Sequence, residues 1–169
     1  MSQEELEFLK RRRSIRHFKP EQIQPEQLKA MEDAAVLAAS AMNEQAWFFA
    51  VIQREDVIEQ LEELADSEGA FYGAKTVIVL FGQDDAISPE TDTILAASNM
   101  MNAAVAVNLG TCFIYLAKKL FNDPRYSQLK AVCGVPEGYT CYGSLAVGIP
   151  DQEIPEPSKR KFDVFSYIR

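Results

Sequence analysis

The sequence predicts a single α+β domain, in which helices pack against a small sheet of about four strands. Its length of 169 residues suits one domain. Along the chain, apolar positions switch between helical and strand spacing. The segment 89–109 is apolar nearly all round, as expected of a helix buried in a core or between subunits. These observations indicate a central helix, a small sheet and, at the end of the chain, an apolar arm.

The first half of the chain predicts helices alternating with strands. Residues 3–10 are expected to form a short amphipathic helix, and Pro25 to open a second helix with apolar residues at three-and-four spacing. The β-branched and aromatic run at 47–52 predicts a strand. Residues 56–64 carry an apolar helical stripe, and the fully apolar run at 76–81 fits a buried strand.

The second half continues this pattern. Gly110 can terminate the central helix, and residues 111–116 predict a strand or a strand-like turn. A further helix is expected at 124–133 and a final strand at 142–149.

The end of the chain combines an extended stretch with an apolar arm. Residues 150–157 are rich in Pro and Glu and are expected to be extended. The arm that follows carries large apolar side chains, too many to be left in water: Phe162, Val164, Phe165, Tyr167 and Ile168.

Charge and composition narrow the possible functions. The net charge of −8 argues against a nucleic-acid partner. Positive charge is concentrated in two islands, which favour a small anionic ligand over a long polyanion. The first island contains Lys10, Arg11, Arg12, Arg13, Arg16 and Lys19, and the second contains Lys159, Arg160 and Lys161.

Several missing patterns also restrict the chemistry. No long apolar run and no signal peptide is evident, and three cysteines without CxxC spacing indicate reduced thiols, so we expect a cytoplasmic protein without a membrane partner. His17 is the one histidine, which argues against multi-histidine metal sites. Neither a phosphate-binding P-loop nor a Rossmann glycine pattern is present. If the protein is an enzyme, we expect a bound cofactor to supply the reactive atom.

Three motifs, at residues 12–18, 40–48 and 96–112, carry a family resemblance. They are Arg-Arg-Ser-Ile-Arg-His-Phe, then Ser-Ala-Met-Asn-Glu-Gln-Ala-Trp-Phe, then an Asn- and Ala-rich helix followed by Asn-Leu-Gly-Thr-Cys. In this order, and with the basic tail at 159–161, they resemble the nitroreductase family. Ala39 and Ala46 replace two prolines that are common in the second motif.

The residue types of the first motif suit a dianionic phosphate. Arg12 and Arg16 offer paired guanidinium donors, spaced to reach one ligand from a turn, and the Ser14 hydroxyl adds another donor. The resemblance adds Arg13 to the cofactor-binding set. The alternative is a solvated basic patch with Phe18 anchored in the core.

The second and third motifs suit the rest of a flavin. Ser40, Asn43 and Gln45 match ribityl hydroxyls and the polar edge of the ring, although Ser40 and Asn43 can equally cap helices. After Gly110, backbone amides can face the negative charge that develops on a reduced flavin. These amides belong to Thr111, Cys112, Phe113 and Ile114. The Cys112 thiol itself is expected to pack as a small hydrophobe, and Asn99 and Asn102 can hydrogen-bond across a subunit interface.

The resemblance implies the remaining expectations. It implies an FMN-binding fold with a mixed or antiparallel sheet flanked by helices, in an intertwined homodimer whose two subunits build each FMN site. Residues 158–169 would wrap the partner subunit, with Lys159 and Arg160 near the phosphate. It also implies a ping-pong reaction in which NADH or NADPH is the electron donor and nitroaromatics, quinones or related small molecules are the acceptors. The alternatives are a flavin-binding protein with a regulatory role and a colourless module that binds an anionic partner.

Overall fold

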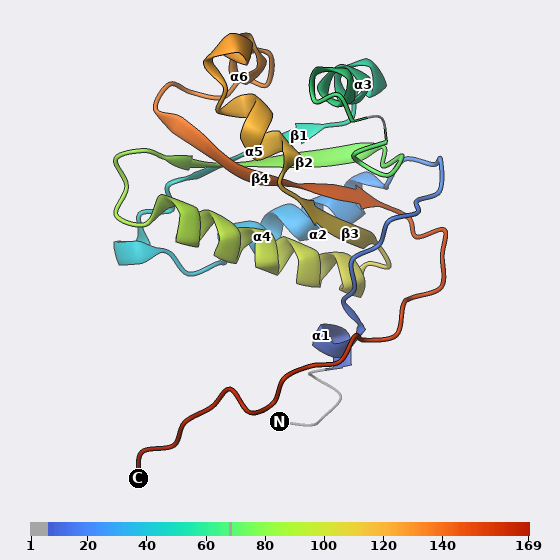
Figure 1. Ribbon diagram of the computed structural model, residues 1–169, viewed down its shortest axis with the longest axis vertical. Coiled ribbons are helices and arrows are strands. Elements are labelled where there is room, and N and C mark those ends of the chain that lie inside the picture. The colour runs from blue at the N-terminus through green and yellow to red at the C-terminus, as the bar shows by residue number, and fades with distance from the viewer. Residues whose placement is uncertain (1–6, 68) are drawn as a thin grey trace.

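The computed structural model describes residues 7–67 and 69–169 as one α+β domain with three layers. A four-stranded sheet forms the middle layer (Figure 1). Helices α2 and α4 cover one face of this sheet, and α3, α5 and α6 cover the other. The predicted α+β class and the predicted number of strands are therefore confirmed.

The sheet is antiparallel throughout, with the strand order β1-β2-β4-β3. Strands β1 (Trp47–Ile52) and β3 (Gly110–Ile114) lie at its edges, and β2 (Thr76–Gln83) and β4 (Tyr139–Gly148) lie inside. Side chains of β2 alternate between the two cores, which explains why its sequence is apolar at successive positions.

Three predicted helices are present with small changes of boundary. Helix α2 spans Pro25–Val36, α3 spans Glu55–Leu64 and α4 spans Pro89–Ala106. A short helix α1 covers Glu7–Arg11, so the first part of the helix predicted at 3–10 lies outside the described residues. In the described part of the chain, no helix is both long enough and apolar enough to cross a membrane.

Two stretches differ from the prediction. The strand predicted at 111–116 ends at Ile114. Leu116, the last residue of the predicted range, is instead the first residue of α5 (Leu116–Phe121). This helix forms because Ala117, Leu120 and Phe121 bury one helical face against the sheet. The helix predicted at 124–133 is divided into a 3-10 turn, η3 (Pro124–Tyr126), and α6 (Gln128–Val132).

The end of α4 is set by Asn108 and not by Gly110. Asn108 adopts a φ of 60°, the left-handed conformation that terminates helices, whereas Gly110 already lies in β3. Gly110 is needed for a different reason, since a Cβ atom there would lie 2.7 Å from Cγ1 of Ile15. The glycine therefore lets the N-terminal segment pack directly on the edge of the sheet.

The C-terminal segment extends away from the domain, as Figure 1 shows. Residues 153–169 form no helix or strand, and the side chain of Ile168 is fully exposed. The segment is attached at its base, where Nε of Arg13 donates to the carbonyl oxygen of Pro155 at 2.9 Å. The predicted extended conformation is confirmed, while the docking of the arm on a partner stays a prediction.

Candidate functional site: an arginine segment and an amide loop

Residues 12–16, here called the arginine segment, lie against the open edge of β3. Ser14 forms a parallel β-bridge with Thr111, and the backbone N–H of Ile15 donates to the carbonyl oxygen of Thr111 at 3.0 Å. The segment is thus extended and is not the turn that the sequence suggested. Because side chains alternate along an extended backbone, Arg12, Ser14 and Arg16 share the face opposite the buried Ile15.

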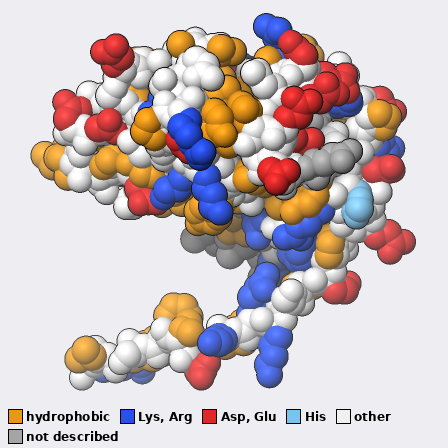
Figure 2. Space-filling model, turned by 45° about the horizontal axis from the view of Figure 1, so that its top comes forward, with side chains coloured by type: hydrophobic (Ala, Val, Ile, Leu, Met, Phe, Trp, Pro, Cys, Tyr) orange, Lys and Arg blue, Asp and Glu red, His pale blue; other side chains and the backbone are white. Residues whose placement is uncertain are grey.

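The arginine segment makes the start of β3 electropositive. The positive charges of Arg16 and Arg12 both act on the thiol of Cys112, although burial has the larger effect and raises the pKa of this thiol. Cys112 is therefore a packed, protonated side chain, as predicted, but its positive neighbours could not be seen in the sequence. Figure 2 shows Lys and Arg side chains gathered where the arm leaves the domain.

Arg13 is directed away from this face. Its guanidinium holds the base of the arm through Pro155, and Nη1 also donates to the carbonyl oxygens of Lys10 at 2.5 Å and Arg12 at 2.8 Å. A cavity of about 320 Å³ lies on the same side, lined by Arg13, Ile15 and the start of β3. A direct cofactor contact by Arg13 stays a prediction, and its contacts in this structure are structural.

Residues 40–45, here called the amide loop, have an unusual backbone. Met42, Asn43 and Gln45 have φ values of 49°, 58° and 51°, which non-glycine residues rarely adopt. The Ser40 hydroxyl oxygen accepts a hydrogen bond from the backbone N–H of Gln45 at 3.1 Å, so Ser40 closes the loop instead of capping a helix. The side chains of Asn43 and Gln45 are exposed and available to a ligand.

Two carboxylates attach the amide loop to the beginning of α4. Asp92, which is only 3% exposed, accepts from the backbone N–H of Ala41 at 3.0 Å. Glu44 accepts from the backbone N–H of Ile87 at 2.9 Å. Sequence reasoning did not identify either anchor, although an aspartate within an otherwise apolar helix is a usable signal for Asp92.

The arginine segment and the amide loop lie at opposite ends of α4 (Figure 1). The loop is attached to Asp92 in the first turns, whereas the segment contacts β3, which follows the end of the helix. At 1.5 Å per residue, α4 separates them by about 20 Å. One chain therefore does not bring its own first and second motifs together.

The third motif joins the first motif at the edge of the sheet. Since the carbonyl oxygen of Thr111 faces the arginine segment, strand alternation turns the amides of Thr111 and Phe113 to the open edge of β3. The amides of Cys112 and Ile114 then face β4, which pairs with β3 along its whole length. The Thr111 amide thus faces the backbone of the arginine segment, with which Thr111 forms its bridge, and the Phe113 amide is the next donor along this edge.

Other predicted residues lie elsewhere. Asn99 donates to the carbonyl oxygen of Ala34 at 3.0 Å, a contact between α4 and α2 within the chain. Arg160 donates to the carbonyl oxygen of Ser158 in its own arm at 3.1 Å. Lys159 and Arg160 are exposed in the arm, which extends away from the domain (Figure 1).

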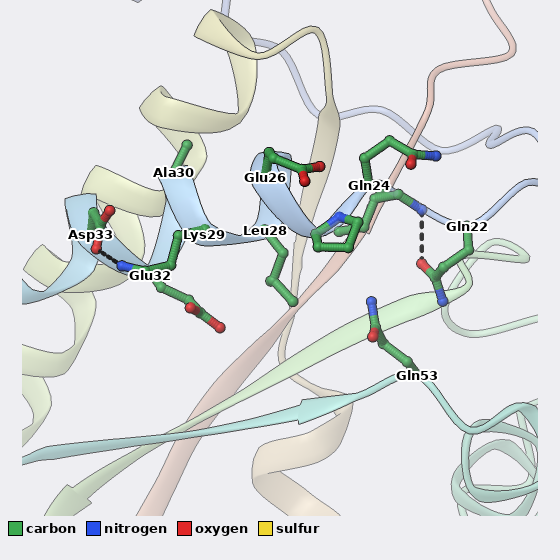
Figure 3. Close-up of a pocket in the computed structure, with 11 residues that line it drawn as sticks. Gln22, Gln24, Glu26, Leu28, Lys29, Ala30, Glu32, Asp33 and Gln53 are labelled. Carbon is green, nitrogen blue, oxygen red and sulfur yellow. Dashed lines mark hydrogen bonds and ion pairs between the residues drawn. The ribbon is translucent and has the colours of Figure 1, made fainter.

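A broad groove along α2 is not the candidate site. It measures about 990 Å³ and runs along α2, where Figure 3 shows Lys29 paired with Asp33 and the Gln22 side chain accepting from the backbone N–H of Ile23. Its lining comes from residues 22–26, 28–30, 32–33 and Gln53, so none of the three motifs contributes. The candidate site is defined by its charge and its donors and not by cavity size.

The chain is an α+β sandwich with an electropositive sheet edge, and comparison with known proteins identifies its family. The model of the Nitroreductase family matches residues 9–70 and 67–149, most of the chain. This protein therefore belongs to the Nitroreductase family.

Individual proteins agree with this assignment. The chain is 27% identical, over 88% of its length, to a protein of Archaeoglobus fulgidus that is provisionally named NADH dehydrogenase/NAD(P)H nitroreductase, of which 86% is covered. The fold of this chain matches that of a nitroreductase with bound FMN from Bacteroides fragilis. The TM-score is 0.91 at 23% identity, and the match covers 99% of this chain and 100% of the other. A nitroreductase with bound FMN from Desulfitobacterium hafniense gives a TM-score of 0.88 at 24% identity, with both chains fully covered (100%).

Proposed function

We propose that this protein is an FMN-dependent NAD(P)H oxidoreductase that reduces nitroaromatics, quinones or related small molecules. The observation that carries the proposal is the common face of Arg12, Ser14 and Arg16 on a backbone fixed to β3. Solved relatives of the same fold are described with bound FMN, and a curated relative carries an NAD(P)H nitroreductase name.

The chemistry of this donor set fits the phosphate of FMN. Two guanidinium groups and a hydroxyl provide charge-assisted hydrogen bonds in the geometry that a phosphate dianion accepts. The Phe113 amide is fixed by the sheet before any ligand arrives, so it can stabilise negative charge without reorganisation. Bound FMN would supply the hydride-accepting chemistry that the protein side chains do not offer.

We propose further that two copies of the chain build each site. The amide loop supports this arrangement, because its exposed Asn43 and Gln45 lie about 20 Å from the arginine segment of the same chain. A second copy can place its own loop beside that segment. The arm at 158–169 would then cross to the partner, bury its apolar side chains there and bring Lys159 and Arg160 to the phosphate.

The proposed reaction order is ping-pong, so donor and acceptor use the same space in turn. Asn43 and Gln45 of one subunit would orient the polar edge of the flavin ring, while Arg12 and Arg16 of the other would hold its phosphate. In the cytoplasm, where the thiols stay reduced, either NADH or NADPH would be available as the donor. Initial-rate plots at several acceptor concentrations should give parallel lines.

The deciding experiment is spectroscopic. The purified protein should be yellow, and the chromophore released by heat should co-elute with FMN on HPLC. Mixing with NADH or NADPH without oxygen should bleach the visible band, and an added quinone should restore it. A protein that binds FMN but is not reduced by either nucleotide would be a regulatory flavin binder, and one that stays colourless after incubation with FMN would refute the proposal.

A further inference from the structure

Arg16 is in contact with an aromatic residue from a distant part of the chain. Its guanidinium carbon lies 5.9 Å from the centre of the Tyr72 ring, within the range of a cation–π interaction. The nearby Tyr72 side chain, as a hydrogen-bonding partner, has the largest effect on the pKa of Arg16, which it raises. Tyr72 belongs to the connection between α3 and β2 and is not part of any of the three motifs.

The backbone around Tyr72 is fixed in an unusual conformation. Tyr72 has a φ of 58°, which is rare for an aromatic residue, and Gly73 follows with a φ of 71°. Two turns surround it, because the N–H of Tyr72 donates to Gly69 at 2.9 Å and the N–H of Ala74 donates to Phe71 at 3.0 Å. Such a conformation persists only where the surrounding contacts over-determine it.

Those contacts come from Glu62 and from the core. The carboxylate of Glu62 on α3 accepts from the backbone N–H of Gly69 at 3.1 Å and from that of Phe71 at 2.9 Å. The Phe71 side chain is completely buried in the core beneath α3. The chain can therefore present the Tyr72 ring at the surface without letting the turn move.

Arg16 needs such a support. Its backbone is held, because its N–H donates to Oε1 of Gln152 at 2.9 Å, but the residue is exposed and its long side chain has many rotamers. Arg12 and Arg16 both act on the Cys112 thiol, so the two like charges share one small region. The Tyr72 ring lies where it can oppose this repulsion by attracting the Arg16 guanidinium.

We propose that Tyr72 is a positioning residue of the cofactor site, which pre-orients the Arg16 guanidinium for the FMN phosphate. The inference rests on the proposed function, because it takes Arg16 as a phosphate ligand. Tyr72 itself acts through Arg16, and Glu62 acts through Tyr72 by holding the turn.

A double-mutant cycle tests this assignment. FMN and riboflavin affinities are measured by flavin-fluorescence titration for the wild type, Tyr72→Phe, Tyr72→Ala, Arg16→Ala and the double variant Arg16→Ala/Tyr72→Ala. Tyr126→Phe is the matched control, because Arg125 lies 5.4 Å from the centre of the Tyr126 ring, in a similar stack outside the site.

Loss of the Tyr72 hydroxyl should weaken FMN binding by about two- to tenfold, and Tyr72→Ala should weaken it further. Riboflavin affinity should not change, because riboflavin has no phosphate, and the control should match the wild type. In the Arg16→Ala background, Tyr72→Ala should have no additional effect. A general structural role would instead lower both affinities and persist without Arg16.

The possible failures are distinct. If Arg16→Ala weakens FMN binding but both Tyr72 variants bind normally, or if the losses are additive, the positioning role is overturned while the proposed function stands. If Arg16→Ala has no effect, the phosphate assignment and the positioning role fall together. Thermal unfolding of each variant identifies a folding defect, and Tyr72→Phe, which keeps the ring, decides the question if Tyr72→Ala does not fold.

Discussion

The arginine segment and the amide loop both present polar side chains, but different contacts hold the two regions in place. The arginine segment has ordinary backbone angles and obtains its position from β3, through the bridge between Ser14 and Thr111. The amide loop obtains its shape from a strained backbone and its position from Asp92 and Glu44. The first region therefore takes both its shape and its position from a strand about 100 residues away in sequence, whereas the second closes on itself through Ser40 and Gln45 and relies on distant residues only for its position.

The separation of the two regions within one chain would explain why the proposed site needs two subunits. Each region would supply some of the donors to the flavin, and the length of α4 keeps the two regions of one chain apart. Assembly of two copies would then create the site, so that cofactor binding and dimerisation strengthen each other by linkage.

The largest expected effect comes from removing the arm. Truncation after Pro157 deletes the exposed apolar side chains of the arm, whose backbone Figure 1 shows extended from the domain, together with Lys159 and Arg160. We expect a monomer or an aggregate that has lost FMN, because burying each large apolar side chain contributes about 1.5–3 kcal/mol before ordering costs. Light scattering and flavin occupancy measure the two properties, and a truncated dimer with full flavin content would contradict the role of the arm.

A complementation experiment tests whether the two regions meet between subunits. The double variant Arg12→Ala/Arg16→Ala removes the ligand-binding side chains of the arginine segment, and Asn43→Ala/Gln45→Ala removes those of the amide loop. Each homodimer should lose FMN, whereas a co-expressed mixed dimer should regain one intact site and bind FMN at about half occupancy. Mixed dimers isolated with two different affinity tags allow the measurement. If they bind no FMN while both parents remain folded, the two regions do not complete each other.

The single arginine substitutions should have a smaller effect. Arg12→Ala and Arg16→Ala each remove a charge-assisted contact worth about 1.5–3 kcal/mol, which is about a tenfold to a hundredfold loss of FMN affinity. Lysine should restore only part of it, because an ammonium group lacks the bidentate geometry. Arg125→Ala, on the exposed Arg125–Asp123 pair, is the control and should bind FMN normally. Fluorescence titration with unchanged affinity in both alanine variants would rule out this role.

The smallest expected effect comes from glycine substitutions that compare backbone strain in the amide loop with that beside the arginine segment. Met42 is 85% exposed and has a φ of 49°, so Met42→Gly should stabilise the protein by about 0.5–1 kcal/mol. His17→Gly, at an exposed position beside the arginine segment without a positive φ, should destabilise it by about 0.5–1 kcal/mol. Urea unfolding with constant slope measures both changes. Equal changes in the two variants would show that strain does not distinguish the regions.

By itself, the sequence determined the fold class, the sheet strands within a few residues, the helices α2, α3 and α4, and the three motifs. These follow from local patterns, because apolar spacing reports which faces a helix or strand must bury. The strand predicted at 47–52 matches β1 without change, since its ends are marked by a loop on each side.

Only the tertiary structure decided which motif residues face a common side and which motifs meet. Arg12 and Arg13 are neighbours of the same chemical type, yet the bridge of Ser14 to Thr111 turns Arg12 to the electropositive face, while Arg13 binds the arm. Asn108, not Gly110, ends α4, because Asn108 adopts the positive φ. Gly110 instead allows the close approach of Ile15. Contacts such as Arg16 with Tyr72 join residues that are distant in sequence, and no local spacing encodes them. The physical reason is that the side to which a side chain points, and the distant residues that it contacts, depend on the register between segments. This register is fixed only when the chain packs.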